Sequence, residues 1–250
     1  MRMSVPRPRA RATLGGRVHG RLRKMLVEGV LSPGEKVSLR TMAARLGVSM
    51  QPVREAVSRL VADRALEVMP NRAVRVPMLT LGQFRELTAI RLAIEGFAAE
   101  RAAEFRSRGD LDDMRRHEAV FRREGASATP HLPAAVAANQ AFHFAVYRAA
   151  ALPELLPIIE GLWLRIGPVL NLDLRSNVSR VRVGRAAGHH GRILDAIARG
   201  DGRAARRALA ADIAGAAKHI ESRGVLPERN RIVPRAAMGS IPARRRKNGS

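Results

Sequence analysis

The clearest structural signal in the chain lies in residues 42–57, which read MAARLGVSMQPVREAV. The apolar residues before Gly47 share one helical face, and a glycine at that point is typical of a helix C-cap. Ser49 favours the start of another helix, and Pro52 falls in its first turn, where its missing N–H does no harm. Two short helices joined by a tight glycine turn are typical of a helix-turn-helix.

The flanking residues complete a small module over residues 17–77. Upstream, apolar residues at helical spacing predict a helix that ends at Gly29. Its apolar face consists of Val18, Leu22, Met25 and Leu26. Downstream, residues 66–69 and 73–76 predict two strands, separated by a turn at residues 70–72. The sequence therefore predicts a winged helix-turn-helix.

The third helix of this module presents a polar face. That face consists of Gln51, Arg54, Glu55 and Ser58. In a helix-turn-helix the N-terminal end of this helix can enter the major groove of DNA. Gln51 can then read a base edge, while Arg40 and Arg54 hold phosphates. Periodicity alone also allows a three-helix module with a purely structural role.

The balance of charge favours a polyanionic partner. The 250-residue chain has 45 Lys and Arg against 22 Asp and Glu, a formal net charge of +23. Such a surplus suits nucleic acid or an acidic membrane surface. Hydrophobic residues make up 46%, enough for a sizeable core. The absence of cysteine excludes disulfide scaffolds, thiolate catalysis and cysteine zinc fingers.

The two ends of the chain carry much of this surplus. Residues 1–16 and 223–250 are rich in Pro and basic residues and lack apolar periodicity, which predicts disordered arms, either solvated or touching DNA. The N-terminus has no apolar segment of a secretory signal, although it also fits a transit peptide. No stretch reaches the roughly 18 apolar residues of a membrane span. We therefore expect a cytoplasmic protein with no membrane partner.

Residues 80–222 are rich in Ala, Leu and Arg and show helical periodicity almost throughout. The expected helices span 80–107, 110–124, 131–150, 153–172, 177–199 and 201–222. Asp110 and Asp201 are interpreted as N-caps, and Gly109 and Gly200 as helix stops. The sequence thus predicts a mainly α protein, with an N-terminal winged helix-turn-helix and a C-terminal all-α helical bundle.

Four polar residues lie on apolar helix faces of this bundle. Asn139 and His143 are one helical turn apart and share a face, while His190 and Asp212 each lie in the apolar stripe of a later helix. An aspartate is costly to bury without a partner, so Asp212 indicates a cation. Three helices can together supply N and O ligands for a divalent Zn, Ni or Mn ion. A lone buried histidine is, however, more often a core residue whose ring nitrogens are hydrogen-bonded to the protein.

The N-terminal motifs closely resemble those of the GntR winged helix-turn-helix regulators over about residues 18–76. The resemblance rests on LSPGEKV at 31–37, MAARLGVS at 42–49 and QPVREAV at 51–57, in the family's order and spacing. It implies DNA contacts from the second helix, the start of the third helix and the wing. The implied contact residues are Arg40, Ser49, Met50, Gln51, Arg54, Asn71 and Arg72. Ala73 replaces the usual wing glycine.

The helical region is similar to the FadR-type ligand domain, the FCD domain, over about residues 80–215. The similarity rests on RLAIE at 91–95, NQAFH at 139–143 and HGRILDAI at 190–197. It implies a metal site, whose last ligand is commonly histidine in the family but falls on an aspartate here. The implied metal ligands are Asn139, His143, His190 and Asp212.

This resemblance also implies a small organic-acid effector. In such domains the metal and a basic side chain together bind a small carboxylate. Arg91 matches the family position for that side chain and can form a bidentate clamp. Arg165, on the helix with Trp163, is a second candidate. A surface ion pair is the simpler interpretation of either arginine.

Together these features predict a homodimeric transcriptional regulator. Two winged modules would read the half-sites of a palindromic double-stranded DNA operator. An organic acid bound in the bundle would change operator affinity, and repression relieved by ligand is the common direction in the family. Two alternatives remain: a non-specific basic nucleic-acid-binding protein, and a metal-dependent enzyme, for which no general base is evident beside the ligands.

Overall fold

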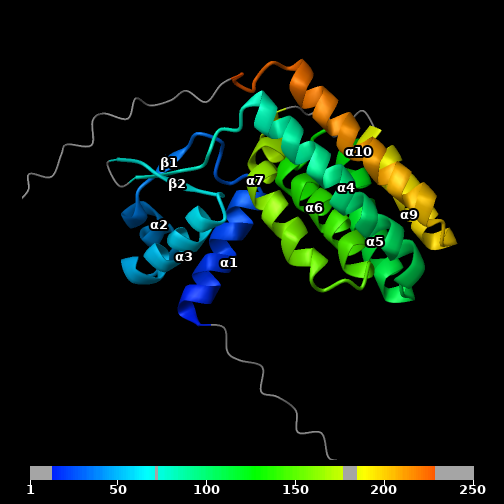
Figure 1. Ribbon diagram of the computed structural model, residues 1–250, viewed down its shortest axis with the longest axis horizontal. Helices are drawn as coiled ribbons and strands as arrows, with labels where there is room; N and C mark the ends of the chain where they lie inside the picture. Colours follow the sequence, from blue (N-terminus) through cyan, green and yellow to red (C-terminus); the bar gives the residue numbers. More distant parts are fainter. Residues whose placement is uncertain (1–12, 71–72, 177–184, 229–250) are drawn as a thin grey trace, which may run out of the picture.

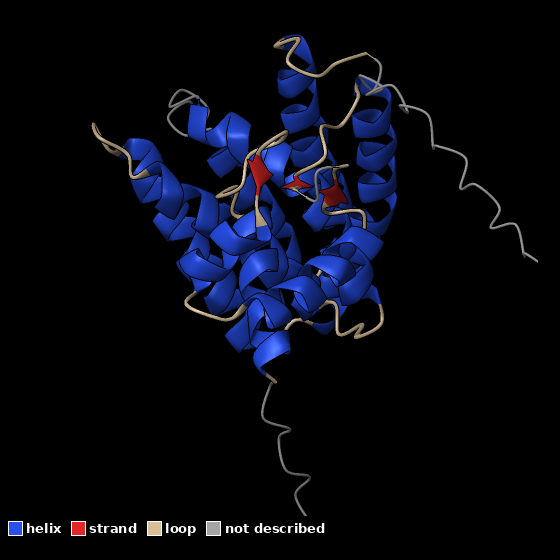
Figure 2. Ribbon diagram, turned by 90° about the vertical axis from the view of Figure 1, so that its left-hand side faces the viewer, coloured by secondary structure: helices blue, strands red, loops and turns tan. Residues whose placement is uncertain are grey.

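A computed structural model describes residues 13–70, 73–176 and 185–228 of the chain. It is mainly α-helical, as predicted, with short strands in the N-terminal module (Figure 2). That module lies beside a larger helical bundle (Figure 1). The described elements are α1 (Leu14–Val27), β1 (Lys36–Val37), α2 (Leu39–Leu46), α3 (Met50–Ala62), β2 (Glu67–Val68), β3 (Val74–Arg75), α4 (Leu81–Phe105), α5 (Arg108–Ala126), α6 (Leu132–Ala149), α7 (Leu155–Ser176), α9 (Arg185–Arg199) and α10 (Gly202–Ser222).

Helices α1, α2 and α3 pack around one apolar core. Ser38 caps α2 by accepting a hydrogen bond from the Thr41 N–H, and α2 ends at Gly47 in the left-handed conformation, φ 65°. Ser49 is the N-cap residue of α3, although its side chain makes no capping bond. The fully buried residues of this core include Leu22, Leu26, Val53 and Leu60. The predicted helix-turn-helix is confirmed.

The wing contains one strand more than the sequence predicted. Strands β2 and β3 pair antiparallel as expected, but β1 (Lys36–Val37) also pairs with β3, in the order β1-β3-β2. Only Val37 of β1 is apolar, so the sequence shows no run of apolar or alternating residues that would indicate this strand. Asn71 and Arg72, at the predicted tip of the wing, lie outside the described residues.

The C-terminal region is the predicted all-α bundle. Helix α4 contacts α6, α7, α9 and α10, while α5 packs against α6 and α9. The predicted helix at 177–199 is described from Arg185 onward as α9, and residues 177–184 lie outside the described residues. The buried residues of α4 and its neighbours include Ala98, Ala102, Phe142, Ile193 and Leu209.

The start of α5 differs from the prediction. Ser107, and not Asp110, is the N-cap residue: its hydroxyl accepts from the Asp110 N–H, and the Asp110 carboxylate accepts from the Ser107 N–H. This reciprocal capping box places Gly109 inside the first turn of α5, where it does not stop a helix. The other boundary is confirmed, since Gly200 (φ 77°) follows α9 and Asp201 caps α10.

Helix α7 is long and apolar enough to cross a membrane, judged by length and composition alone. Its segment Leu155–Arg175 meets the criteria of length and composition, contrary to the expectation that no stretch would. Within this segment an 18-residue stretch is 56% buried inside the protein, and Trp163 and Ile166 belong to the core. Because α7 contacts α1, α4, α6 and α10, its position inside the fold explains its apolar composition.

Helix α7 also joins the two modules through α1. The Asn171 side-chain amide donates a hydrogen bond to the Val27 carbonyl at the end of α1. Gly29 follows with φ 66°, and a Cβ at this position would lie 2.6 Å from the Asn171 Cβ. Arg23 and Glu160 form an ion pair of 2.8 Å between the same helices. The N-terminal module is therefore held by a close contact that glycine permits.

The described ends run past the predicted domain limits. Helix α1 begins at Leu14, inside the segment predicted as the N-terminal arm, and Thr13 caps it. After α10, Leu226 packs against a cluster of α4 and α7 residues, and the Pro227 carbonyl accepts a hydrogen bond from the Leu81 N–H at 2.9 Å. The rest of both predicted arms lies outside the described residues.

Candidate functional site

Helices α2 and α3 carry the predicted DNA-contacting side chains on the surface. Arg40 on α2 is exposed, as are Ser49, Gln51 and Arg54 at the start of α3. The Gln51 amide donates to Glu55 Oε1 at 3.1 Å, which orients it along the first turns of α3. Exposed guanidinium and amide groups at a helix N-terminus suit phosphates and base edges.

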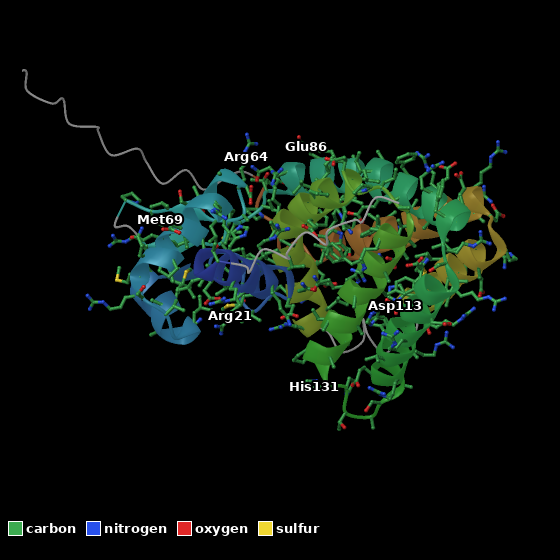
Figure 3. The ribbon with its side chains drawn as sticks, turned by 90° about the horizontal axis from the view of Figure 1, so that it is seen from below. Arg21, Arg64, Met69, Glu86, Asp113 and His131 are labelled. Atoms are coloured by element: carbon green, nitrogen blue, oxygen red, sulfur yellow. The ribbon has the colours of Figure 1, made fainter. Side chains whose placement is uncertain are left out.

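Met50 and Arg21 connect this surface to the rest of the module. Met50, a predicted contact, is half-buried against the core of the module. Arg21 on α1 was not anticipated: its guanidinium donates to the Leu46 carbonyl at 3.0 Å and so ties the end of α2 to α1 (Figure 3). The spacing of residues in α1 gives no indication of which carbonyl Arg21 reaches, so sequence reasoning missed it.

Three of the predicted metal ligands meet inside the bundle. His143 on α6, His190 on α9 and Asp212 on α10 each offer one ligand atom, and these atoms lie within 4.8 Å of one another. His143 Nε2 is 3.3 Å from Asp212 Oδ2. The fourth predicted ligand, Asn139, lies one turn before His143 and is half-buried.

The environment of His190 differs from that of a satisfied core histidine. The side chain is fully buried, and neither ring nitrogen has a hydrogen-bond partner within the described residues. The ring stacks on Phe142 with centroids 4.2 Å apart. Burial lowers the pKa of His190 to about 3, so the imidazole is neutral. A neutral, buried and unpartnered ring nitrogen fits a divalent metal ion.

Asp212 supplies a negative charge to this cluster. Burial tends to raise the pKa of its carboxyl, but the hydrogen bond with His143 and the charges of nearby histidines outweigh burial and lower the pKa to about 2. The carboxylate is therefore ionised. Two imidazole nitrogens and one carboxylate oxygen form a donor set that suits Zn and also Ni or Mn.

A hydrogen-bonded chain of buried side chains lies behind His143. The Tyr147 hydroxyl is 3.3 Å from His143 Nδ1 and donates to Glu95 Oε2 at 2.5 Å. Glu95 accepts from Arg91 through both carboxylate oxygens, from Nε at 2.7 Å and from Nη2 at 3.1 Å. These hydrogen bonds therefore connect α4 to the His143 imidazole on α6.

These hydrogen bonds orient the His143 ring. Burial and the Glu95 carboxylate raise the pKa of Tyr147 well above its usual value, so the phenol keeps its proton. Because that proton is donated to Glu95, the Tyr147 oxygen can accept a hydrogen bond from His143 Nδ1. His143 Nε2 faces the Asp212 carboxylate on the other side of the ring. Such partners orient a ligating histidine and tune its basicity.

The two predicted effector-binding arginines occupy different positions. Arg91 is 4% exposed, binds Glu95 through two of its nitrogens and lies 5.2 Å from the centre of the Trp163 ring. Its charge is therefore already balanced by Glu95. Arg165 is two residues beyond Trp163 and hence on the opposite side of α7. Since the Trp163 ring faces His143, at 5.5 Å between centroids, the fold does not bring Arg165 to the cluster.

Three residues around the cluster were not anticipated from the sequence. Glu95 and Tyr147 follow Arg91 and His143 by four positions, so their one-turn spacing is a signal that could have revealed them. Trp163 belongs to another helix and has no such signal. Its indole N–H is buried and has no hydrogen-bond partner in the described part of the chain.

Two hollows lie where the N-terminal module meets the bundle. The first, of about 270 Å³, is lined by the linker, α7 and the end of α10, including Met78 and Leu172. The second, of about 650 Å³, is lined by α1, α6 and α7, including His19 and Arg148. Neither is lined by the histidines and aspartate of the cluster.

Both modules match known families. Residues 14–76 match the gntR family of bacterial regulatory proteins, and residues 86–215 match the FCD domain. The second match covers more than half of the chain. The chain therefore belongs to the GntR family of bacterial transcriptional regulators, in the FadR-type group that carries an FCD domain.

Individual relatives agree with this assignment. The HTH-type transcriptional regulator McbR of Escherichia coli (strain K12) is 34% identical over 154 residues, 62% of this chain and 69% of McbR. A protein named as a probable D-xylose utilization operon transcriptional repressor, from Paenarthrobacter nicotinovorans, is 31% identical over 204 residues, 82% of this chain and 87% of that protein. The solved structure of E. coli McbR/YncC has a TM-score of 0.79 at 27% identity and covers 86% of this chain and 100% of that chain. The chain is thus a DNA-binding transcriptional regulator and not an enzyme.

Proposed function

We propose that this regulator is a cytoplasmic, homodimeric repressor of a palindromic operator, and that a small carboxylate bound at a divalent metal in the bundle changes its operator affinity. One observation carries the proposal: His190 is buried with both ring nitrogens unpartnered beside His143 and Asp212. Similarity to a protein named as a probable transcriptional repressor supports the direction of regulation.

In this proposal His143, His190 and Asp212 hold the metal ion, with Asn139 as a neutral fourth ligand. When bound, the ion supplies positive charge and open coordination positions, which suit a carboxylate. Glu95 already balances the charge of Arg91, so the metal, and not a free arginine, attracts the acid. The unpartnered indole N–H of Trp163 offers a hydrogen bond to the same ligand.

The route from this site to the DNA-reading helix runs along α7. Trp163 lies against His143 in the first half of α7, and Asn171 holds the Val27 carbonyl of α1 about two turns later. Helix α1 in turn packs on α3. A ligand that favours one position of α7 therefore favours one placement of α3. Coupling of this kind typically amounts to about 1–3 kcal/mol, or roughly 5–150-fold in affinity.

Metal content per chain tests the site directly. The tag-free full chain is incubated with Zn, Ni or Mn, desalted and analysed by mass spectrometry, beside Asp212→Ala and the control Asp195→Ala, which removes an exposed aspartate on α9. We expect about one equivalent in the parent and in the control, and none in Asp212→Ala. A parent that binds none of the three metals would show that the proposed site does not exist.

The regulatory half of the proposal needs a second measurement. Operator affinity is measured by fluorescence anisotropy with and without small carboxylates, using a scrambled duplex to test the non-specific alternative. We expect the metal-loaded parent to change affinity by roughly 5–150-fold, whereas Asp212→Ala binds the operator but does not respond. If operator affinity of Asp212→Ala changes with the carboxylate as it does in the parent, the effector binds independently of the metal.

A further inference from the structure

The hollow between α1, α6 and α7 is the larger of the two at the junction of the modules. Its volume of about 650 Å³ falls in the range of small-molecule sites. Gly16 and Gly20 line it from α1, and Ala137 and Ala141 line it from α6. A Cβ at Gly20 would meet no atom within 4 Å, so the space opposite this glycine is open. The small residues of both helices therefore leave room for a ligand.

The charges around this hollow leave one cation without an acid. Arg23 pairs with Glu160 at 2.8 Å. Lys24 pairs with Glu28 at 3.6 Å, so both acids that line the hollow are already balanced. Arg148 on α6 is exposed and forms no ion pair in the part of the chain that the structure describes. The hollow therefore suits a ligand with a single negative charge.

His19 lines the same hollow from α1 without adding to its charge. Burial, followed by the positive charges of Arg23 and Arg59, lowers the pKa of its imidazole below the usual 6.5. The ring is therefore uncharged at neutral pH, and Arg148 is the group that attracts an anion.

Three lining residues of α6 follow one another at intervals of about one helical turn. Gln140, Phe144 and Arg148 are four positions apart, so they lie along one face of the helix, roughly 6 Å from one to the next along its axis. They offer, in this order, an amide, a half-buried aromatic ring and a guanidinium. A flat ring that carries a carboxylate can pack on the Phe144 ring and reach Arg148 with its charged group. This face of α6 therefore matches an aromatic carboxylic acid.

The hollow is bounded by both modules. Helix α1 lies on the side of the N-terminal module that faces the bundle (Figure 1), and it packs on α3 as well as on α7. On the bundle side, the Phe144 ring lies edge-on to Trp163, with centroids 5.3 Å apart. His143, His190 and Asp212 do not line the hollow, so it is separate from the proposed metal site. A ligand in the hollow would therefore contact both modules at once without using the metal.

We propose that the hollow between α1 and α6 is a second ligand site, which binds an aromatic carboxylic acid and thereby holds the N-terminal module in one position against the bundle. The ring of the acid packs on Phe144, and its carboxylate pairs with Arg148. Because the ligand favours one placement of α1, and α1 packs on α3, its binding changes operator affinity. This inference goes beyond the proposed function, since the site needs no metal.

Calorimetric titration of the metal-free full chain with benzoate at neutral pH tests this site. We expect a dissociation constant below about 1 mM, as is reasonable for so small a ligand. Benzamide keeps the ring but lacks the charge, and acetate keeps the charge but lacks the ring, so each should bind at least about 10-fold more weakly than benzoate. A parent chain that binds benzoate no better than acetate overturns the site.

Gly20→Leu fills the hollow and tests the location of the ligand. The new side chain has room, and leucine favours a helix more than glycine does, so helical content measured by circular dichroism should stay at the parent value. Benzoate binding should weaken at least about 10-fold, because the leucine occupies the space of the ring. Gly82→Leu, at an exposed glycine in the first turn of α4, is the matched control and should bind benzoate like the parent. Equal benzoate binding by Gly20→Leu and the parent places the ligand elsewhere and overturns the site.

Arg148→Gln tests the charged contact. It removes the cation but keeps a polar side chain, so benzoate should bind at least about 10-fold more weakly, whereas the weak binding of benzamide should not change. Arg203→Gln, at an exposed arginine of α10, controls for the change in net charge and should bind benzoate like the parent. If Gly20→Leu does not fold, this comparison decides alone.

The outcomes separate this site from the proposed metal site. Benzoate that binds only the metal-loaded chain, and binds Gly20→Leu as well as the parent, occupies the metal cluster; that result overturns this inference and leaves the proposed function intact. Loss of benzoate binding in Gly20→Leu, with metal content unchanged, supports this inference whether or not the metal site responds to carboxylates. In fluorescence anisotropy, benzoate should change the operator affinity of the metal-free parent by at least about 5-fold and leave that of Gly20→Leu unchanged. Benzoate binding without a change in operator affinity overturns the proposed coupling to DNA.

Discussion

The N-terminal module and the helical bundle organise their functional side chains in opposite ways. In the module, Arg40 and Arg54 are exposed, and each can meet DNA with little help from its neighbours. In the bundle, His143 and His190 are buried, and His143 depends on a hydrogen-bonded chain that begins at Arg91. A substitution in the module can therefore change binding without changing the fold, whereas a substitution in the bundle site changes both.

The largest expected effect is the loss of stability of the metal-free protein in acid. The pKa of His190 is about 3 in the folded chain, against the usual value of 6.5, so between these values the unfolded chain binds a proton that the folded chain excludes. The corresponding stability is complete above about pH 6.5 and is lost as the pH falls toward 3, by at most roughly 4–5 kcal/mol. Asp212, with a pKa of about 2 against 3.8, adds a loss only at lower pH.

Urea unfolding of metal-free protein between pH 7.5 and 4.5 measures this effect. We expect the free energy of unfolding to fall by roughly 3 kcal/mol over this range, and to fall much less in His190→Phe, which keeps a ring against Phe142. If the free energy of unfolding falls equally with pH in the parent and in His190→Phe, His190 is not buried in its neutral form.

A smaller effect on stability is expected from Tyr147→Phe. Loss of the hydroxyl leaves His143 Nδ1 without its partner and Glu95 with one donor fewer, which should destabilise the fold by about 1–3 kcal/mol. Metal affinity should fall about 10- to 100-fold, because His143 loses the partner that orients it. Isothermal titration with Zn measures the affinity, and urea unfolding the stability.

Thr88→Val is the matched control for this substitution. It removes another buried hydroxyl, which donates to the Phe84 carbonyl within α4. It should lower stability to a similar extent and leave metal affinity unchanged. Equal metal affinities in Tyr147→Phe and the parent would show that the hydrogen-bonded side chains behind His143 stabilise the fold but do not affect metal binding.

The features that the sequence could predict are local. Gly47 ends α2 because glycine adopts the left-handed conformation at low cost, and Ser49 marks the start of α3, so both helices follow from a few adjacent residues. The sequence also indicated His143, His190 and Asp212, because a polar residue within an apolar helical stripe lies on the buried side of its helix.

The features that the sequence could not predict depend on tertiary contacts or on competing local signals. The position of Trp163 beside His143 requires the packing of α6 on α7, which no spacing within one helix encodes. At the start of α5, Ser107 and Asp110 are both good caps, and only the reciprocal bonds decide between them. Arg165 belongs to the same helix as Trp163, yet membership of a helix does not specify the side that faces a site.

Arg54→Ala should have the smallest effect on stability. It therefore tests most sharply whether the N-terminal module, unlike the bundle, can lose binding without losing stability. Arg54 is exposed and makes no ion pair within the described residues, so its removal should change the free energy of unfolding by less than about 0.5 kcal/mol. Operator affinity should nevertheless fall by about 1–3 kcal/mol, because a guanidinium at the start of α3 is lost from the groove. Arg203→Ala, which removes an exposed arginine from α10, controls for the change in net charge and should retain affinity. Unchanged operator binding by Arg54→Ala would place the DNA on another surface, whereas a large loss of stability would mean that the module, like the bundle, depends on its functional side chains to fold.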